Sequence, residues 1–558
     1  MNKFYPLLKI DTLSAFVSIA IGVFTVLILC YSLRPMARRP GLAQYYSCIV
    51  VTGVASILTV LSNNLILLLA SWGLLGLTLY LLINMGDENS SKAARKALII
   101  VGGADALMLL GIGVLYGLSG TFQMDRISVD MNSGHYWLAG ISYLCVAIAC
   151  FAKSGAMPFH TWIPGCAESA PIEVTAFLPA SLDKLIGIYL LTRLSLNIFI
   201  MSPLMNSLLL VIGAFTIIAG VMMALVQHDM KKLLGYHAIS QVGYMVLGLG
   251  TGNIIGIAGG IFHMLNHAIY KSCLFLTAGN VEYRSGNTDL ERSGGLGKVM
   301  PVTFAACVIA SLSISGVPPF NGFVSKWLVY QGLILHMSSG GAVPAVLGSL
   351  CLAAAMFGSG LTLASFMKLL HAVFMGRDFD ETKVREIKEA PLSMILPPVI
   401  LAGACVLFGV FSFPLKYFIF PSVSPGNTVS SASLPGIWSP AAATVLVILG
   451  LLLGLIIFGS RPLRSSKRKD AAFVGGELSG STDRNRVTGA DFYRTIQDIG
   501  VLKSIYSKAQ AGFFDIYEQA KKLKVISGFL QYLHNGVLPS YLVWMLLGMV
   551  GLFWLLVR

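Results

Sequence analysis

The sequence predicts an all-α polytopic membrane protein of about fourteen transmembrane helices, for three reasons. Of the 558 residues, 56% are hydrophobic and only 11% are charged, whereas about a quarter of the residues in soluble domains are charged. Apolar stretches of about 20 residues recur along the whole chain, and each is long enough to cross ~30 Å of hydrocarbon. The short alternating strands of a membrane β-barrel do not occur in the sequence, so we expect helices to cross the bilayer.

The apolar stretches define the expected helices in chain order. The earlier ones are 11–33, 43–62, 64–85, 95–118, 137–157, 172–193, 203–227 and 231–250. The later ones are 254–279, 299–335, 343–374, 391–413, 438–459 and 537–557, with 299–335 counted as one interrupted helix.

The formal charge of +14 does not indicate nucleic acid as a partner, because the basic residues are distributed as membrane orientation requires. Connectors after even-numbered helices hold little beyond Arg126 and Lys416. By the positive-inside rule, we expect both termini to lie outside the membrane. The connectors after odd-numbered helices hold Arg34, Arg38, Arg39, Lys92, Arg95, Lys96, Lys231, Lys232, Arg284, Arg292, Lys298, Arg377, Lys383, Arg385 and Lys388.

The C-terminal part differs in composition from the membrane domain. Residues 461–490 are polar and rich in Gly and Ser, and Ile499, Leu502, Ile505 and Tyr506 follow at helical spacing. This pattern predicts a lateral amphipathic helix on the cytoplasmic side. We therefore divide the chain into N-terminal membrane helices (1–94), two inverted-repeat halves (95–250 and 251–413), an additional helix (414–460), a linker with the lateral helix (461–536) and a final transmembrane helix (537–558).

A short internal sequence repeat predicts the two halves. SGAMPF at 154–159 and SGVPPF at 315–320 share SGxxPF, and each lies beside a lysine, Lys153 or Lys326. A repeat of about five helices, an odd number, must be inverted in the membrane, as in many transporters. Because proline removes a helical hydrogen bond, the expected helix breaks lie at Pro158, Pro164, Pro318 and Pro319.

Ionisable residues within the apolar stretches are the main functional signal. A charge at the bilayer centre costs ~2.5–3.5 kcal/mol on insertion scales, although any single one could be a structural pair or a snorkelling side chain. Buried lysine and histidine can exchange protons near neutral pH, so the set predicts a proton wire. The residues are Asp105, Lys153, Asp183, Lys184, His237, His263, His267, Lys271, Lys326, Lys368 and His371.

The segment 262–272 holds the densest group of these residues. His263, His267 and Lys271 lie four residues apart and share one face of a helix. Zinc is the weaker alternative, because no Glu follows His263 and no third ligand is nearby. The nine cysteines form no CxxC pair, and no GxGxxG or P-loop occurs, so no cofactor is expected in this chain.

Four motifs carry a resemblance to a known family. KSGAMPFHTWIP (153–164) resembles the KSxxxPxHxWLP signature of antiporter-like subunits of respiratory complex I, of multisubunit cation/proton antiporters and of energy-converting membrane-bound [NiFe] hydrogenases. The resemblance continues in the same order through ALVQHDMKKLLGYHAISQVGYMVLGLG, FHMLNHAIYKSCLFLTAGNV and SGVPPFNGFVSKW, over about residues 11–415.

The resemblance implies a proton-translocating subunit of a redox-driven membrane complex in the prokaryotic inner membrane. Fe–S, NiFe or quinone chemistry would belong to partner subunits, and this chain would bind no redox centre. Lys153 would be the central lysine of the first half-channel, Lys326 that of the second, and Lys184 the connecting residue. The remaining pathway residues would be His237, His263, His267, Lys271 and Lys368.

Two departures from the family pattern matter. The first helix resembles the family's third, so about two N-terminal helices are expected to be missing. The glutamate of the family's WExxGL, which pairs with the first lysine, is Gly73 in WGLLGL. Because an unpaired buried charge is costly, we expect a neutral Lys153, an acid from a neighbouring subunit, or one of four acids in this chain: Asp105, Glu168, Glu173 and Asp183.

The sequence leaves two other functions open. One is a component of a Na⁺/H⁺ antiporter. The other is a structural subunit that keeps the fold and has lost transport.

Overall fold

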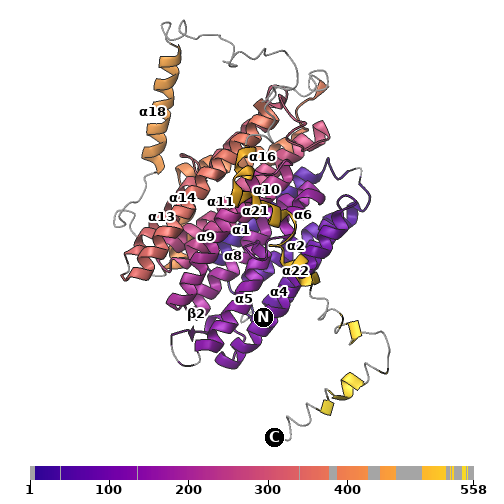
Figure 1. Cartoon of the computed structure of the whole chain (residues 1–558), viewed down its shortest axis with the longest axis vertical. Coiled ribbons are helices and arrows are strands. Elements are labelled where there is room, and N and C mark those ends of the chain that lie inside the picture. Colours follow the sequence, from indigo (N-terminus) through magenta and orange to yellow (C-terminus); the bar gives the residue numbers. More distant parts are fainter. Residues whose placement is uncertain are drawn as a thin grey trace. The chain divides into compact units, whose positions relative to one another are not determined.

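In the computed structural model the chain is mostly helical (Figure 1). The structure describes residues 7–375 except 38, 133, 135 and 339, then 386–424, 440–459, 493–522 and short pieces between 528 and 550. The predicted linker 461–490 and most of the predicted final helix 537–557 lie outside the described residues.

The helices follow the predicted apolar stretches closely. The first ten are α1 (Thr12–Ser32), α2 (Leu42–Leu61), α3 (Leu65–Ile83), α4 (Ser90–Ser119), α5 (Tyr136–Ser154), α6 (Trp162–Ser169), α7 (Ile172–Phe177), α8 (Asp183–Arg193), α9 (Pro203–Leu225) and α10 (Met230–Gly250). The next are α11 (Ile254–Ser285), α12 (Pro301–Ser315), α13 (Asn321–Met337), α14 (Ala342–Leu370), α16 (Leu392–Val410), α17 (Phe420–Val423) and α18 (Pro440–Gly459).

Nine helices in the described part of the chain are long and apolar enough to cross a membrane. They include α1 to α5, the segment 172–198, α9, the segment 342–375 and α16. α10 and α11 are long but do not qualify, and these are the helices that carry His237 and the His263–Lys271 face. The chain is therefore a multi-pass membrane protein in which the most polar helices are shielded by apolar ones.

α11 is the central element of the bundle. It packs against α10, α12, α13 and α16, and also against α7 and α8. Its residues from Ile255 to Val281 are all buried. A helix that is buried all round has no lipid-facing side, so its polar residues face other helices.

The predicted helix 172–193 consists of three pieces. α7 passes into a π-helical turn, η2 (Leu178–Leu182), which contains Pro179, and α8 follows directly. A proline inside a helix removes one hydrogen bond, and a π-helical turn accommodates the irregularity. α8 then ends in a second π-helical turn, η3 (Leu194–Ile198).

Both predicted helix breaks occur, and they have the same local structure. α5 ends at Ser154 and α12 at Ser315, each followed by a left-handed glycine, Gly155 (φ 79°) or Gly316 (φ 81°). In the first break the N–H of Ala156 donates to the carbonyl of Phe151, and in the second the N–H of Val317 donates to the carbonyl of Leu312. The Met157–Pro158 and Pro318–Pro319 peptide bonds are cis. The position of one expected break is corrected: Pro164 is in the first turn of α6, where proline is tolerated.

Hydrogen bonds between connectors define two opposite faces of the bundle. At the N-terminal face, residues 7–9 pair with 61–63, Asn64 pairs with Gln123, and β1 (Val129–Asp130) pairs with β2 (Phe199–Ile200). At the basic face, Asp229 pairs with Asp289, and Lys231 and Lys232 form ion pairs with Glu282 and Glu168.

The C-terminal residues from Ile499 onward form a separate unit. Within it the structure describes α21 (Gly500–Gln510) and α22 (Ile516–Lys522). Val501, Ile505, Phe513 and Phe514 are exposed there. The described part of the predicted lateral segment is thus helical and presents apolar side chains on its surface. Before it, α20 (Arg494–Asp498) belongs to the membrane unit.

Candidate functional site

The eight basic residues expected in the pathway are all buried, with at most 1% of each residue exposed. Burying an ionisable group is costly unless partners or water receive it. The surroundings of each one therefore decide what the set can do.

Lys153 lies in the last turn of α5 and pairs with Asp183, the first residue of α8. Lys153 Nζ is 3.6 Å from Asp183 Oδ1, and both side chains are almost completely buried. Of the alternatives left open by the sequence, Asp183 is thus the acid that reaches Lys153 directly.

Asp105 lies near the same lysine but is bound to an indole. Trp72 Nε1 donates to Asp105 Oδ1 at 2.8 Å, and Lys153 Nζ lies 5.8 Å from the centroid of the Trp72 ring. This distance permits a cation–π interaction. Trp72 therefore stands between the lysine and a second, half-buried carboxylate.

Gly73, where the resembling sequences carry a glutamate, faces away from the buried lysine. The residue is exposed, and a Cβ placed on it would meet no atom within 4 Å. A glutamate here would point out of this chain.

Glu168 and Glu173 do not pair with Lys153. Glu168 forms an ion pair with Lys232 at 3.0 Å on the basic face, where half of its side chain is exposed. Glu173 is buried in α7 and lies within electrostatic reach of Arg39 and Lys231. Both acids thus belong to the basic end of the bundle.

Lys184 lies against the first helix break. Its Nζ has no hydrogen-bond partner among the described residues, and it lies 5.9 Å from the centroid of the Trp162 ring. Trp162 Nε1 donates to the carbonyl of Ala152 at the end of α5. A Cβ on Gly155 would lie 3.4 Å from Lys184 Nζ, so the absence of a side chain at Gly155 lets the lysine approach the break.

His267 and Lys271 continue the row on α11. Nζ of Lys271 has no hydrogen-bond partner in the part of the chain that the structure describes. His267 lies within hydrogen-bonding reach of the backbone of Ala180 in η2. Lys271 Nζ lies 5.7 Å from the ring centroids of Phe275 and Phe366. Lys184 on α8 lies within electrostatic reach of both residues.

His263, one turn before His267, is held at both ring nitrogens. Nδ1 lies 2.9 Å from Ser325 Oγ, and Nε2 lies 3.1 Å from Gln241 Oε1 and 3.2 Å from Tyr270 Oη. Ser325 precedes Lys326 on α13, so this histidine links α11 to the second lysine.

Lys326 fills the second helix break. Its Nζ donates to the carbonyl of Ile314 at 2.8 Å and to Ser359 Oγ at 3.1 Å, and it lies 4.5 Å from the centroid of the Tyr244 ring. The hydroxyls of Tyr244 and Tyr330 lie 2.9 and 2.7 Å from the same Ser359. The lysine thus binds a backbone carbonyl that the break leaves without its helical partner.

The last two basic residues lie towards the basic face. His237 Nε2 lies 2.7 Å from Ser365 Oγ on α14. Lys368, one turn later on α14, donates to the carbonyls of Leu225 and Gln227 at 2.9 and 2.8 Å. Leu225 is the last residue of α9 and Gln227 lies just beyond it, so Lys368 caps the C-terminal end of α9.

The sequence alone did not distinguish the uncharged members of this network. They are Trp72, Gln241, Tyr244, Ser325, Tyr330, Ser359 and Ser365. Serine and tyrosine are common in helices, and only their position beside Lys326, His263 or His237 distinguishes them. The one available signal was the serine directly before Lys326.

No group of three or more His, Cys, Asp or Glu residues suited to holding a metal ion occurs within the residues that the structure describes. His263 and His267, considered for zinc from their spacing, make ring contacts with Tyr270. All nine cysteines are free thiols.

Known proteins resemble this chain in sequence and in fold. The chain is 30% identical to a component of the Na(+)/H(+) antiporter of Alkalihalophilus pseudofirmus over 89% of its length, and spans about 65% of that relative. It is 28% identical to hydrogenase-4 component B of Escherichia coli over 80% of its length and 69% of that protein's.

The fold matches a solved structure of an archaeal respiratory membrane complex, the membrane-bound sulfane sulfur reductase. The TM-score is 0.78 over 98% of this chain and 89% of the matched chain, at 23% identity. Residues 62–353, more than half of the chain, match the family described as NADH:quinone oxidoreductase/Mrp antiporter, TM. The chain therefore belongs to the NADH:quinone oxidoreductase/Mrp antiporter transmembrane family.

Proposed function

We propose that this chain is the proton-translocating, antiporter-like subunit of a redox-driven membrane complex. The observation that carries the proposal is that three buried lysines, Lys153, Lys184 and Lys271, each have an Nζ atom without a hydrogen-bond partner among the described residues. Buried polar groups of this kind are normally bound by water. A hydrated row of lysine and histidine is suited to passing protons across the centre of a bundle.

In this proposal the row runs through both halves of the molecule. Lys153 with Asp183 holds the proton of the first half, and Lys184, His267, Lys271 and His263 connect it to Lys326. His237 and Lys368 extend the path towards the basic face. The two halves would be inverted repeats, and the matching geometry of the breaks after Ser154 and Ser315 supports that relation.

We infer the following setting for the chain. The partners are other membrane proteins of the same complex, as the relatives' names and the matched respiratory complex suggest. Redox chemistry, on Fe–S, NiFe or quinone centres, takes place in those partners and supplies the energy. The basic face lies in the cytoplasm and both termini lie outside the inner membrane.

The test is proton uptake by inverted membrane vesicles that contain the complex. Vesicles receive hydrogen, formate, NADH or reduced sulfur compounds in turn, in sodium-free buffer, while a pH-sensitive dye reports acidification. We expect donor-dependent acidification that an uncoupler abolishes. Its absence with every donor, in vesicles shown to contain the assembled complex, would contradict the proposal.

Sodium transport is the second candidate, because a relative that is 30% identical is named as part of a Na(+)/H(+) antiporter. A hard cation such as sodium needs several oxygen ligands. The centre of the row offers mainly nitrogen atoms, which favours protons. Acidification that requires added sodium would reverse this preference.

A further inference from the structure

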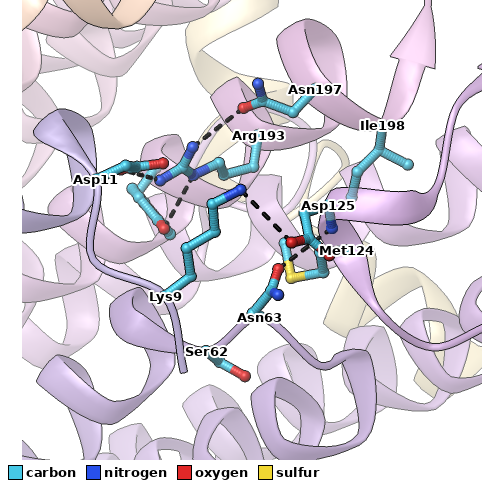
Figure 2. Close-up of a pocket in the computed structure, with 10 residues that line it drawn as sticks. Lys9, Asp11, Ser62, Asn63, Met124, Asp125, Arg193, Asn197 and Ile198 are labelled. Carbon is cyan, nitrogen blue, oxygen red and sulfur yellow. Dashed lines mark hydrogen bonds and ion pairs between the residues drawn. The ribbon is translucent and has the colours of Figure 1, made fainter. Parts of the chain in front are cut away.

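A polar pocket lies at the N-terminal face, and nothing in the lysine and histidine row accounts for it (Figure 2). Its volume is about 170 Å³. The segment before α1, the α2–α3 connector, the segment after α4 and the end of α8 all contribute to its lining. The bulk of the basic connectors lies on the opposite face.

Two ion pairs line this pocket. Arg193 Nη2 lies 2.5 Å from Asp11 Oδ1, and Lys9 Nζ lies 3.6 Å from Asp125 Oδ2. Arg193 Nε also donates to Tyr189 Oη at 2.9 Å, and Nη1 donates to Asn197 Oδ1 at 3.2 Å. About a third of the Asp11 side chain is exposed, whereas only 13% of the Arg193 side chain is. The arginine is thus fixed by three neighbouring side chains at the inner wall, beside a carboxylate that solvent reaches.

Tyr189 connects the pocket to the interior. It is 2% exposed, and its hydroxyl donates to the carbonyl of Val60 at 2.6 Å while it accepts from Arg193. It lies on α8, which begins with Asp183 and Lys184.

A line of buried hydroxyls leads from Val60 into the membrane. Thr52, Ser56 and Thr59 lie on one face of α2 with at most 1% exposed. Thr59 Oγ1 donates to Ser71 Oγ of α3 at 2.8 Å. Ser71 precedes Trp72, whose ring lies 5.8 Å from Lys153 Nζ. Side chains one turn apart are about 5–6 Å from each other, a gap that one water molecule can bridge.

We propose that this pocket is the mouth of the first half of the pathway on the N-terminal face, and that Asp11 and Arg193 form its gate. The inference rests on the proposed function. In this proposal water molecules bridge Lys153 to Ser71, Thr59 to Tyr189 and Tyr189 to Asp11, and each water or hydroxyl that accepts a proton on one side gives one up on the other. Thr59 donates to Ser71 at rest, so outward transfer requires both hydroxyls to turn. Asp11 receives the proton and releases it to solvent, while Arg193 stays protonated and keeps other cations out of the line.

The test closes the pocket with a covalent reagent. Asn197 is exposed and touches only Arg193 among the charged groups of the pocket, so Asn197→Cys is expected to fold. Asn132→Cys is the matched control, because Asn132 is exposed on the same face in the connector after β1. Both purified complexes, and the parent with its native thiols, are treated with a bulky charged thiol reagent before reconstitution into vesicles, and mass spectrometry measures the extent of modification.

We expect modification at position 197 to abolish proton translocation and modification at position 132 to leave it unchanged. Full modification at position 197 with unchanged translocation would overturn the inference and leave the proposed function intact. A thiol at position 197 that does not react at all would also overturn it, since a mouth must be accessible. Failure of the untreated parent complex to translocate protons would instead overturn the proposed function, and the inference with it.

A second variant tests the line without a reagent. Tyr189→Phe removes the hydroxyl between Val60 and Arg193 and keeps the ring. Tyr143→Phe is its control, because Tyr143 is equally buried and its hydroxyl lies 3.0 Å from Ser195 Oγ, outside the line. We expect loss of translocation for Tyr189→Phe alone. Equal rates in the two assembled variants would contradict the role of Tyr189.

Discussion

Lys153 has its ion-pair partner on a different helix from the one on which resembling sequences carry a glutamate. Gly73 lies on α3 and faces outward, whereas Asp183 begins α8 and points at the lysine. The pair is nearly inaccessible to solvent. Removing one member of such a pair leaves the other charge uncompensated. Asp183 therefore compensates the buried charge of Lys153 in this bundle.

Asp183→Asn is therefore expected to impair the protein strongly. The loss of a buried ion-pair partner costs about 3–5 kcal/mol, and proton translocation should also be lost. Glu168→Gln is the matched control, because the exposed pair of Glu168 with Lys232 contributes only about 0–1 kcal/mol. Thermal unfolding of the purified complex and vesicle acidification measure the two effects. Equal unfolding temperatures for the two variants would contradict the assigned pairing.

Gly73→Glu is expected not to rescue Asp183→Asn. The new carboxylate would project from the exposed side of α3, at a cost of ~2.5–3.5 kcal/mol if it stays charged in lipid. Gly73→Ala controls for loss of the glycine itself, since a Cβ there meets no atom within 4 Å. Recovery of translocation in the double variant would show that a side chain at position 73 reaches Lys153 after all.

Asp11 gives a pH-dependent contribution to stability. Burial raises the pKa of this carboxyl, but the hydrogen bond and charge of Arg193 and the N–H of Ser14 together lower it by more. The net pKa is therefore below the usual 3.8. The contribution is therefore complete above about pH 4 and is lost as pH falls through the lowered pKa. Asp11→Asn keeps the helix cap and removes the charge. We expect it to lower the unfolding temperature at pH 7 and to have no effect near pH 2; a constant difference at both pH values would contradict this.

At the scale of single residues, the sequence predicted the buried basic residues but not the side chains that each of them contacts. The eight buried basic residues were all recognisable from charge within apolar stretches. The partner of Lys153 was left among several alternatives, because it depends on how α5, α7 and α8 are rotated against one another. Hydroxyl partners such as Ser359 could not be distinguished for the same reason.

Among the elements, the two helix breaks carry the most information. Each combines a left-handed glycine with a nearby lysine: Gly155 with Lys184, and Gly316 with Lys326. In the second break the lysine donates to the freed carbonyl of Ile314. In the first, Trp162 supplies the donor to the carbonyl of Ala152 and Lys184 Nζ has no hydrogen-bond partner in the described ranges. Lys184 at the first break thus makes fewer hydrogen bonds than Lys326 at the second.

Gly155→Ala tests the first break as an element. A Cβ would overlap the side chain of Ile163 and crowd Lys184, and alanine disfavours φ 79°. We expect destabilisation by more than about 1 kcal/mol together with slower translocation. Gly102→Ala is the control: Gly102 lies within α4 with no atom near its Cβ position, and alanine there is neutral or stabilising by up to about 1 kcal/mol. Similar effects of the two variants would contradict a special role for the break.

The extent of most helices was predictable, because hydropathy determines where a chain can cross a bilayer. The predicted 11–33, 43–62 and 391–413 differ from α1, α2 and α16 by a few residues at each end. Hydropathy does not report hydrogen-bond geometry, so the π-helical turn at Leu178–Leu182 and the helical position of Pro164 could not be foreseen. The count of about fourteen transmembrane helices stays a prediction, beside nine long apolar helices in the described residues.

At the scale of the whole molecule, the buried row is organised around α11. α11 carries His263, His267 and Lys271, and it packs against α8, which carries Lys184, and α13, which carries Lys326. Lys184 lies within electrostatic reach of His267 on α11, and His263 on the same helix lies 2.9 Å from Ser325 Oγ, beside Lys326. α11 therefore contacts the helices at both ends of the buried row.

The most direct test of the central claim is proton translocation by the complete complex with Lys326→Gln. Glutamine can still donate hydrogen bonds to Ile314 and Ser359 but cannot carry a proton. Lys232→Gln, at a half-exposed ion pair on the basic face, is the control. With assembly verified by co-purification of the partner proteins, we expect Lys326→Gln to abolish vesicle acidification and Lys232→Gln to retain it. Acidification at the parent rate in the assembled Lys326→Gln complex would contradict the account and leave this chain a purely structural component.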